Sequence, residues 1–163
     1  METIAVYWEP VIKTYGFQKR SGLSLVKLTT HRDRLADIGL TFIGLEKYGV
    51  AYEFSMLKYS ESTNIELFLL VQRQWKNDIK AFFQNRETEY TIETIFPVDL
   101  VYFQGPHFGD RYGIADAACH ALLSSGIVFL LASFSGASVH LVFADGVGEK
   151  AIAALSEAFQ APG

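Results

Sequence analysis

The segment from Val98 to Phe159 constrains the fold most, because its pattern predicts one strand fewer than a complete domain needs. It contains apolar runs typical of strands and amphipathic runs typical of helices. The expected elements are strands at 100–103, 127–134 and 138–143 and helices at 114–124 and 149–159. This β-α-β-β-α order lacks the last strand of a ferredoxin-like layer, in which two helices cover an antiparallel sheet. We therefore expect another part of the chain to supply that strand.

Residues 23–96 contain all the elements of a second unit of the same kind. Strands are expected at 23–29, 50–59, 64–71 and 90–96, and helices at 35–45 and 73–86. The first helix has apolar residues at three- and four-residue spacing, and Gly49 follows it as a helix-ending glycine. The order of these elements is βαββαβ, so this unit needs no strand from outside.

The N-terminal residues contain more predicted strand than the second unit needs. Runs typical of strands cover Thr3–Trp8 and Val11–Gln18. The second of these runs is expected to form a hairpin with the run that begins at Leu23. Because the C-terminal unit lacks one strand, the simplest arrangement lets Val11–Gln18 complete its sheet. Pro97 marks the place where the chain returns, since proline restricts the preceding residue to extended geometry.

The predicted fold class is therefore α+β, with two ferredoxin-like βαββαβ units whose antiparallel sheets carry helices on one face. The unit at 22–97 is inserted into a unit made of residues 1–21 and 98–163. The chain has 163 residues, half of them apolar, and this is enough to bury a core in each unit.

Charge and hydropathy exclude several classes of protein. The net charge of -4 and the pI of 5.5 leave no basic surface for nucleic acid or for a membrane. The longest apolar run, near Ile127–Ala132, is far shorter than the roughly 18 residues of a spanning helix, and the N-terminus has no secretion signal pattern. We therefore expect a cytoplasmic protein with no nucleic-acid or membrane partner. The single cysteine, Cys119, is expected to pack within a helix, and no metal or cofactor motif is present.

Several features of the C-terminal segment point to a known family. They are the strand from Leu100, the loop from Gly105 to Gly113, the helix start Gly113-Ile114-Ala115, the helix exit Gly126-Ile127 and the terminal helix from Ala151 to Phe159. This segment resembles the second ACT domain of aspartokinases. From Val11 to Ala36 and onward, the sequence is similar to the strand and first ACT domain of that family, in which one ACT domain is also inserted into the other. Nothing resembles the family's N-terminal kinase domain, and no Gly-rich phosphate loop with its lysine is present. The resemblance therefore implies regulation without catalysis.

The loops that precede the first helix of each unit are the candidate binding sites. Backbone N–H groups at a helix start attract an anion, and glycines let a ligand approach the backbone, so the carboxylate of an amino acid fits either loop. The candidates are Thr30, His31, Asp33 and Ala36 in the first loop and Gly105, His107, Gly109, Asp110, Gly113 and Ile114 in the second. In the lysine-sensing aspartokinases that the chain resembles, an acidic residue early in the next strand binds the ligand. This resemblance implies the same role for Glu53.

Each candidate also has a structural explanation. The glycines are typical of a tight strand-to-helix connection, and a lone glutamate such as Glu53 is typical of a solvated strand. His31 and His107 have no carboxylate or cysteine partner at ligand spacing, as is usual for polar surface residues. The pairs Asp33-Arg34 and Asp110-Arg111 are typical of helix caps and surface charges.

The expected function is that of a non-catalytic sensor of a small molecule, an amino acid according to the resemblance. Aromatic residues make up 14% of the chain and the mean hydropathy is +0.17, so we expect apolar surface to remain for a homodimer. The signal would then pass to a separate regulated enzyme.

The alternative is an RNA-binding or protein-interaction module of the same fold. Lys13–Phe17 is similar to an RNP motif, but it lies in the first strand of an acidic chain rather than in the third strand of its unit. An enzyme is disfavoured because no nucleophile with a paired base is present in the sequence.

Overall fold

The computed structural model describes residues 10–47, 49–60, 63–84 and 90–161, so the strand expected at Thr3–Trp8 lies outside the described residues. The chain forms two compact units. Unit 1 contains Met1–Ser21 and Val98–Gly163, and unit 2 contains Gly22–Pro97. Two strands, β2 (Phe17–His31) and β5 (Thr91–Gln104), have residues in both units.

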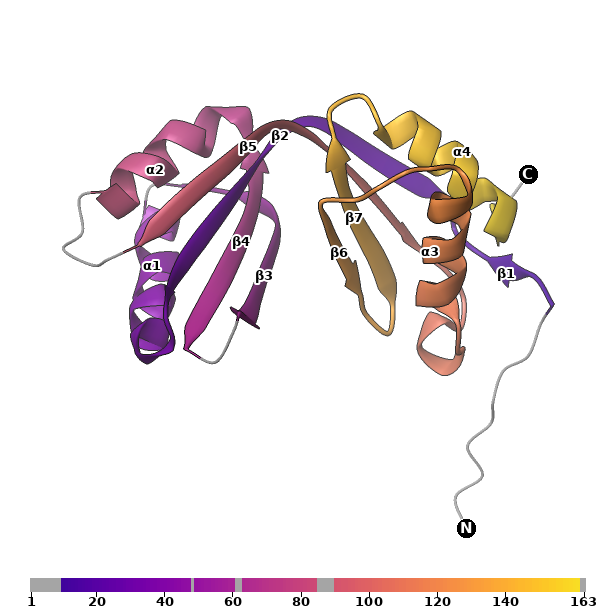
Figure 1. Ribbon diagram of the computed structural model, residues 1–163, viewed down its shortest axis with the longest axis horizontal. Helices are drawn as coiled ribbons and strands as arrows, with labels where there is room; N and C mark the ends of the chain where they lie inside the picture. Colours follow the sequence, from indigo (N-terminus) through magenta and orange to yellow (C-terminus); the bar gives the residue numbers. More distant parts are fainter. Residues whose placement is uncertain (1–9, 48, 61–62, 85–89, 162–163) are drawn as a thin grey trace, which may run out of the picture. The chain divides into compact units, whose positions relative to one another are not determined.

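Unit 2 is an antiparallel sheet with two helices on one face (Figure 1). Between β2 and β5 it contains η1 (Arg32–Arg34), α1 (Leu35–Lys47), β3 (Tyr52–Ser60), β4 (Asn64–Gln72), η2 (Arg73–Trp75) and α2 (Lys76–Gln84). The strand order is β3-β4-β2-β5, and both β2 and β3 pair with β4 in antiparallel fashion. This arrangement is the βαββαβ order expected from the sequence.

The core of unit 2 lies between its sheet and its helices. Side chains alternate between the two faces of a strand, so every second residue of β2 and β4 points to the helices. These residues pack against apolar positions three and four apart on α1 and α2. The buried residues are Val26, Leu28, Ile65, Leu67, Leu69 and Val71 from the strands and Ile38, Leu45, Ile79 and Phe83 from the helices.

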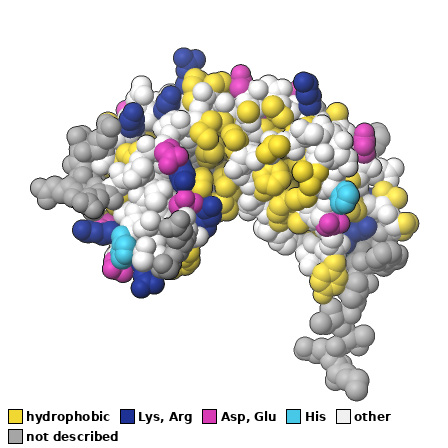
Figure 2. Space-filling view, in the orientation of Figure 1, with side chains coloured by type: hydrophobic (Ala, Val, Ile, Leu, Met, Phe, Trp, Pro, Cys, Tyr) yellow, Lys and Arg dark blue, Asp and Glu magenta, His cyan; other side chains and the backbone are white. Residues whose placement is uncertain are grey.

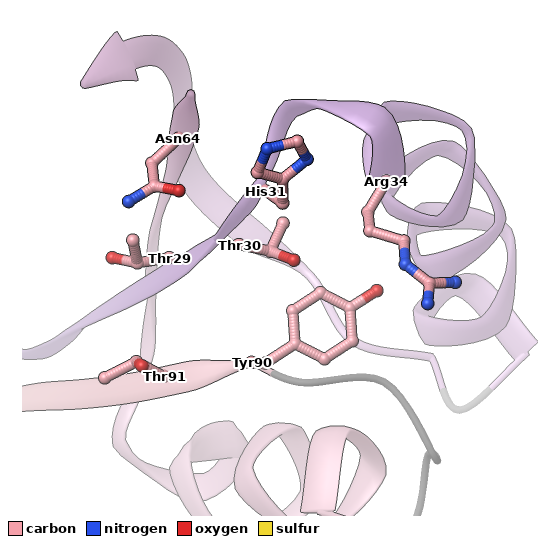
Figure 3. A pocket seen from close by; sticks show the side chains of 7 residues that line it. All are labelled: Thr29, Thr30, His31, Arg34, Asn64, Tyr90 and Thr91. Carbon is pink, nitrogen blue, oxygen red and sulfur yellow. The ribbon is translucent and has the colours of Figure 1, made fainter. Parts of the chain in front are cut away.

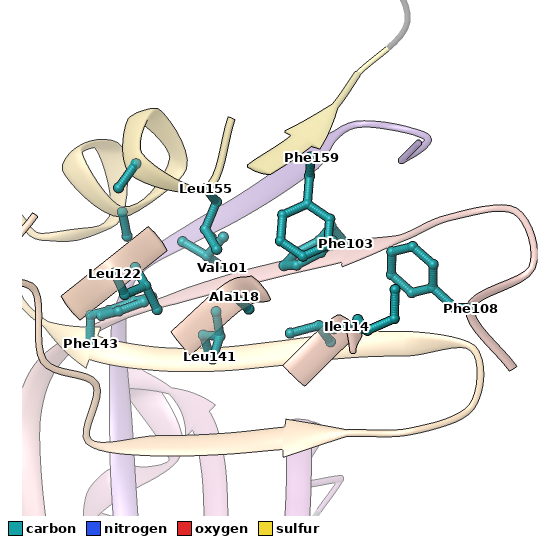
Figure 4. Packing of buried hydrophobic residues seen from close by; sticks show 13 residues of the cluster. Val101, Phe103, Phe108, Ile114, Ala118, Leu122, Leu141, Phe143, Leu155 and Phe159 are labelled. Carbon is teal, nitrogen blue, oxygen red and sulfur yellow. The ribbon is translucent and has the colours of Figure 1, made fainter. Parts of the chain in front are cut away.

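Unit 1 repeats this plan with strands from both ends of the chain. Besides parts of β2 and β5 it contains β1 (Ile12–Lys13), η3 (Phe108–Asp110), α3 (Ile114–Ser124), β6 (Leu131–Phe134), β7 (Ser138–Ala144), α4 (Gly148–Ala158) and β8 (Phe159–Gln160). β7 pairs with β5 and β6 in antiparallel fashion, and β1 pairs with β8 in parallel. Figure 4 shows the core, in which Val101, Phe103, Leu141 and Phe143 of the strands meet residues of α3 and α4.

The opening run of the chain lies against β5 in unit 1. The backbone N–H of Tyr15 donates to the carbonyl oxygen of Gln104 at 2.8 Å, and the Tyr102 hydroxyl donates to Oε1 of Gln18. The ring centroids of Phe17 and Phe103 are 5.0 Å apart. The N-terminal part of the chain therefore completes this sheet, and the expected fold class, α+β with one unit inserted into the other, is confirmed.

Two expected chain breaks are wrong. β2 is continuous over 15 residues, so no hairpin joins Val11–Gln18 to Leu23. Gly22 adopts a φ of 69° inside this strand, a conformation that glycine allows because it has no Cβ. β5 is continuous over 14 residues and runs through Phe96-Pro97, a cis peptide, instead of ending there. Both strands are long because each pairs with neighbours in both units.

Three other boundaries differ from the expected ones. β6 begins at Leu131 instead of Ile127, because residues 127–130 form the connection that follows α3. Residues 73–75 form a 3₁₀ turn before α2, so the α-helix is shorter than expected. α4 ends at Ala158, and Phe159 begins the short strand β8, which pairs with β1.

Candidate functional site

A pocket of about 700 Å³ lies in unit 2, at the end of the sheet where β2 finishes and β4 and β5 begin (Figure 3). It is lined by Thr29, Thr30, His31, Arg34, Asn64, Tyr90 and Thr91. These residues come from the end of β2, the η1 turn and the starts of β4 and β5. Figure 3 shows the ribbons of β2 and β5 diverging at the pocket. The volume lies within the range of about 300–1,000 Å³ that is usual for small-molecule sites.

The antiparallel sheet brings these residues together from distant parts of the sequence. β2 ends where β4 begins, and the register pairs His31 with Asn64. Tyr90 and Thr91 reach the same edge at the start of β5, which is the other neighbour of β2. Polar residues at the ends of rigid strands are a common source of binding groups.

The lining is rich in hydrogen-bonding groups, and among its described residues one side chain has a permanent charge, the guanidinium of Arg34. No aspartate or glutamate is among the described residues that line the pocket. The Tyr90 hydroxyl is buried and has no hydrogen-bond partner among the described residues, which is uncommon and costs free energy. In Figure 3 this hydroxyl and the Arg34 guanidinium lie toward the same end of the pocket, next to α1. That end of the pocket therefore offers hydrogen-bond donors and a positive charge.

Two aspartates contact the charged and titratable lining residues without lining the pocket themselves. Nη1 of Arg34 lies 3.3 Å from Oδ2 of Asp37. Nδ1 of His31 lies 3.2 Å from Oδ2 of Asp33 and 3.4 Å from its backbone nitrogen. A neutral imidazole accepts from that N–H, whereas a protonated one donates to the carboxylate. The His31–Asp33 pair is exposed and the Arg34–Asp37 pair is partly exposed, so both are weak enough for a ligand to replace.

A buried carboxylate beside the pocket is already satisfied by the protein. Glu66 lies opposite Thr29 in the β2–β4 register. Lys27 Nζ and Lys58 Nζ lie 2.9 Å and 3.0 Å from its two carboxylate oxygens. Burial raises the pKa of the Glu66 carboxyl, but the hydrogen bonds from the two lysines outweigh it and hold the pKa below its usual value. Glu66 is therefore a charged partner of the lysines.

The structure brings together some of the residues predicted in unit 2. Thr30 and His31 line the pocket, whereas Asp33 and Ala36 are exposed and do not. Glu53 lies near the opposite end of the sheet, where its carboxylate accepts from Nε2 of Gln72 at 3.4 Å. Because Gln72 ends β4 and the pocket lies at the start of β4, Glu53 is separated from the pocket by the length of that strand within this chain.

Sequence reasoning missed most of the lining. It assigned Arg34 to the surface and did not single out Thr29, Asn64, Tyr90 or Thr91. The last four are polar residues at or next to the ends of predicted strands. The order of the strands in the sheet brings these strand ends together, so a prediction of that order could have identified them.

The predicted site in unit 1 is packed by its own atoms. A Cβ on Gly105 would lie 2.2 Å from Cε1 of Phe108 and 2.3 Å from the carbonyl oxygen of Lys13. A Cβ on Gly109 would lie 2.9 Å from the carbonyl oxygen of Gly136. These glycines permit close approach between parts of the protein, which supports the structural explanation of the loop.

The remaining predicted residues of that loop have separate positions. His107 and Asp110 are exposed, with Nδ1 of the histidine 3.7 Å from Oδ2 of the aspartate. Gly113 has a φ of 87° at the start of α3, and Ile114 is buried in the core of unit 1.

Features of other functional classes are weak in the described part of the chain. Of the two aromatic residues of the RNP-like run, Phe17 is partly buried against Phe103 and Tyr15 is 68% exposed. RNP aromatics stack two or three bases, so one exposed ring is a weak match to that motif. Among the described residues, no three His, Cys, Asp or Glu side chains form a group that could hold a metal ion. None of the described helices has both the length and the apolar character needed to span a membrane.

No protein-family model and no curated protein sequence matches the chain, but solved structures do. The ligand-free regulatory subunit of aspartate kinase from Thermus thermophilus is similar with a TM-score of 0.78 and 13% identity, over 90% of this chain and 99% of that chain. Aspartate kinase from Synechocystis is similar with a TM-score of 0.81 and 14% identity, over 93% of this chain and 27% of that chain.

A third similar structure is a putative C-terminal regulatory domain of aspartate kinase from Porphyromonas gingivalis. Its TM-score is 0.63 and its identity 18%, over 88% of this chain and 95% of that chain. The chain therefore has the fold of the regulatory part of aspartate kinases, and the resemblance expected from the sequence is confirmed at the level of the fold.

Proposed function

We propose that this chain is a non-catalytic regulatory module that binds an amino acid in the unit 2 pocket. The observation that carries the proposal is the position of the pocket. It lies at the loop before the first helix of the unit, in a fold shared with a regulatory subunit over 90% of this chain. The lining supports binding, because it combines a cation with several hydroxyl and amide groups.

The lining can accommodate both charged groups of an amino acid. The guanidinium of Arg34 matches a carboxylate, with which arginine forms paired hydrogen bonds. The side-chain oxygens of Asn64 and the threonines can accept from an ammonium group. The ligand would therefore be oriented with a carboxylate toward Arg34 and its ammonium group toward the neutral oxygens of the lining.

A ligand between β2 and β5 would favour the arrangement of strand ends that fits it. Both strands continue into unit 1, so they offer a covalent route for the effect. A ligand shifts such an equilibrium only by its differential affinity for the two states, typically about 1–3 kcal/mol. As the module is non-catalytic, we expect the signal to act on a separate partner enzyme.

A homodimer is part of the same proposal. β3 is the edge strand of unit 2. Its residues Tyr52, Leu57 and Tyr59 are 45%, 41% and 70% exposed, and their partners on β4 belong to the helix-side core, so all three project from that face. Ile43 of α1 is 55% exposed, and Figure 2 shows hydrophobic side chains over the strands of this unit. A second copy paired along β3 would cover this edge and its apolar residues.

Thermal unfolding with each of the twenty amino acids at millimolar concentration tests the sensor. We expect at least one to raise the melting temperature, because a ligand at a hundred times its Kd adds about 2.7 kcal/mol to the free energy of unfolding. Asn64→Ala should reduce this shift, whereas Asn77→Ala, on the exposed side of α2, should not. The sensor proposal is rejected if none of the twenty stabilises the protein.

Light scattering tests the dimer. We expect the mass of two chains, and Leu57→Lys should yield one chain because it places a charge in the paired edge. Leu123→Lys is the matched control, since Leu123 is 71% exposed on α3 of unit 1. A monomeric wild-type protein would remove homodimerisation from the proposal.

A further inference from the structure

The charges around the unit 2 pocket bear on the kind of ligand it selects. Among the described lining residues Arg34 is the only permanently charged side chain, and there is no carboxylate. The nearest acidic residues of the loop, Asp33 and Asp37, contact His31 and Arg34 from outside the lining. Among the described residues, the lining itself therefore carries the positive charge of Arg34, and the two aspartates lie beside it.

A basic side chain on the ligand would be poorly accommodated in this lining. Removing an ammonium or guanidinium group from water is unfavourable unless a carboxylate or several acceptors replace its hydration. A basic ligand would also lie in the same pocket as Arg34, and like charges in a confined site repel. The family resemblance implied that Glu53 would neutralise a basic ligand, but Glu53 lies near the far end of β4 and contacts Gln72.

An acidic side chain would satisfy groups that the protein leaves open. The side chain of Arg34 is 56% exposed and pairs with the partly buried carboxylate of Asp37 at 3.3 Å, so its guanidinium remains accessible to a ligand carboxylate. The buried Tyr90 hydroxyl has no partner among the described residues and can donate to a carboxylate oxygen. Thr30 lines the same pocket from the neighbouring strand.

We infer that the pocket selects an amino acid with an acidic side chain, of the aspartate and glutamate class, over neutral and basic amino acids. This inference rests on the proposed function, since it assigns a ligand class to the same site. Arg34 recognises the side-chain carboxylate and Tyr90 donates a second hydrogen bond to it, while the hydroxyl and amide N–H donors of the threonines and Asn64 bind the α-carboxylate.

Titration calorimetry on the whole chain with matched ligands tests the inference. Aspartate is compared with asparagine and glutamate with glutamine, because each pair differs by a carboxylate against an amide of nearly equal size. Lysine and threonine complete the set. We expect one of the two acids to bind at least tenfold more tightly than its amide and than lysine, and its affinity to fall as salt is raised.

Variants of the two proposed contacts separate ligand binding from folding. Arg34→Gln should remove the preference for acid over amide, and Arg34→Lys should retain part of it. Arg32→Gln is the control, because Arg32 is exposed on the same turn and does not line the pocket. Tyr90→Phe should weaken the acid several-fold and leave the melting temperature of the free protein unchanged or raised, because it removes an unpaired buried hydroxyl.

The outcomes distinguish this inference from the function on which it rests. Tighter binding of an amide, of lysine or of threonine overturns the acidic class and leaves the sensor standing. An acid preference that survives in Arg34→Gln overturns the assignment of Arg34 as the group that recognises the side-chain carboxylate. Absence of binding by every amino acid overturns the sensor and the inference together.

Discussion

The two units build the same loop before their first helix, yet unit 2 has a pocket there and unit 1 has an aromatic cluster. Strand registers identify the equivalent positions. His31 pairs with the first residue of β4, and Gln104 pairs with the first residue of β7. Thr30 in unit 2 therefore corresponds to Phe103 in unit 1.

The side chain at this position accounts for much of the difference. The ring of Phe103 lies 5.0 Å from Phe17, 6.0 Å from Phe108 and 4.8 Å from Phe159, measured between centroids. The hollow beside it measures about 160 Å³, against about 700 Å³ beside Thr30. The unit 1 loop contributes to the core of its unit, whereas the unit 2 loop borders a pocket, where we propose that a ligand binds. The same fold thus has a filled loop in one copy and an open one in the other.

The largest expected effect comes from shortening these two side chains. Phe103→Ala should lower the free energy of unfolding by about 3–5 kcal/mol, because it opens a cavity among the rings of Phe17, Phe108 and Phe159. Thr30→Ala should lower the free energy of unfolding by about 1 kcal/mol. Urea unfolding measures both, and hydrogen exchange should locate the Phe103→Ala effect in α3 and β7. If both variants lowered the free energy of unfolding equally, the proposed difference in packing between the two loops would be wrong.

A smaller effect is expected two residues further along each loop. Gly105→Ala should cost about 1–3 kcal/mol, since its Cβ would meet the Lys13 carbonyl oxygen at 2.3 Å. The equivalent position in unit 2 is Arg32, which is exposed, and Arg32→Ala should change stability by no more than about 0.5 kcal/mol. Thermal unfolding distinguishes the two, and a tolerated Gly105→Ala would contradict the close packing of the unit 1 loop.

The smallest effects concern pH and a second pair of equivalent residues, His140 on β7 and Glu66 on β4. His140 stacks on Tyr102 with ring centroids 5.7 Å apart, and burial lowers the pKa of His140 below its usual 6.5. The unfolded state therefore gains a proton at higher pH than the folded state. The stability that neutral His140 contributes is complete above pH 6.5 and is lost as the pH falls toward the lowered pKa.

Glu66 gives unit 2 a different pH window. Its folded pKa is held below the usual 4.5 by Lys27 and Lys58 despite burial, so its contribution is complete above pH 4.5 and is lost only below it. Hydrogen exchange during acidification should show unit 1 loosening before unit 2. His140→Gln should remove the first step and Glu66→Gln the second. Simultaneous loosening in all variants would assign the pH dependence to other groups.

Sequence periodicity predicted most of the elements, because helical and strand spacings are local properties. α3 begins and ends where its apolar pattern does, at Ile114 and Ser124. Gly22 and Pro97 suggested chain breaks, but pairing with neighbouring strands carries β2 and β5 through both residues. Local signals of this kind do not report how far a strand continues when distant segments pair with it.

The pocket was only partly predictable for the same reason. Thr30 and His31 were identifiable because they precede a helix, whereas Asn64 and Tyr90 join them through the sheet order. The sequence marked both loops as equivalent candidates. The difference between them depends on the side chain at one equivalent position, Thr30 or Phe103, and on how many rings surround the second, and neither follows from loop composition.

The sharing of β2 and β5 has a consequence for the gene. β2 and β5 are neighbours in the sheet, the Tyr102 hydroxyl of β5 donates to Gln18 near the start of β2, and the chain passes from unit 1 to unit 2 after Ser21 and back again at Val98. Removal of the codons for residues 22–97 would leave two adjacent strands that a tight turn can rejoin. The inserted half is in this sense a cassette, which recombination can delete or exchange while the remaining half keeps every strand of its own sheet.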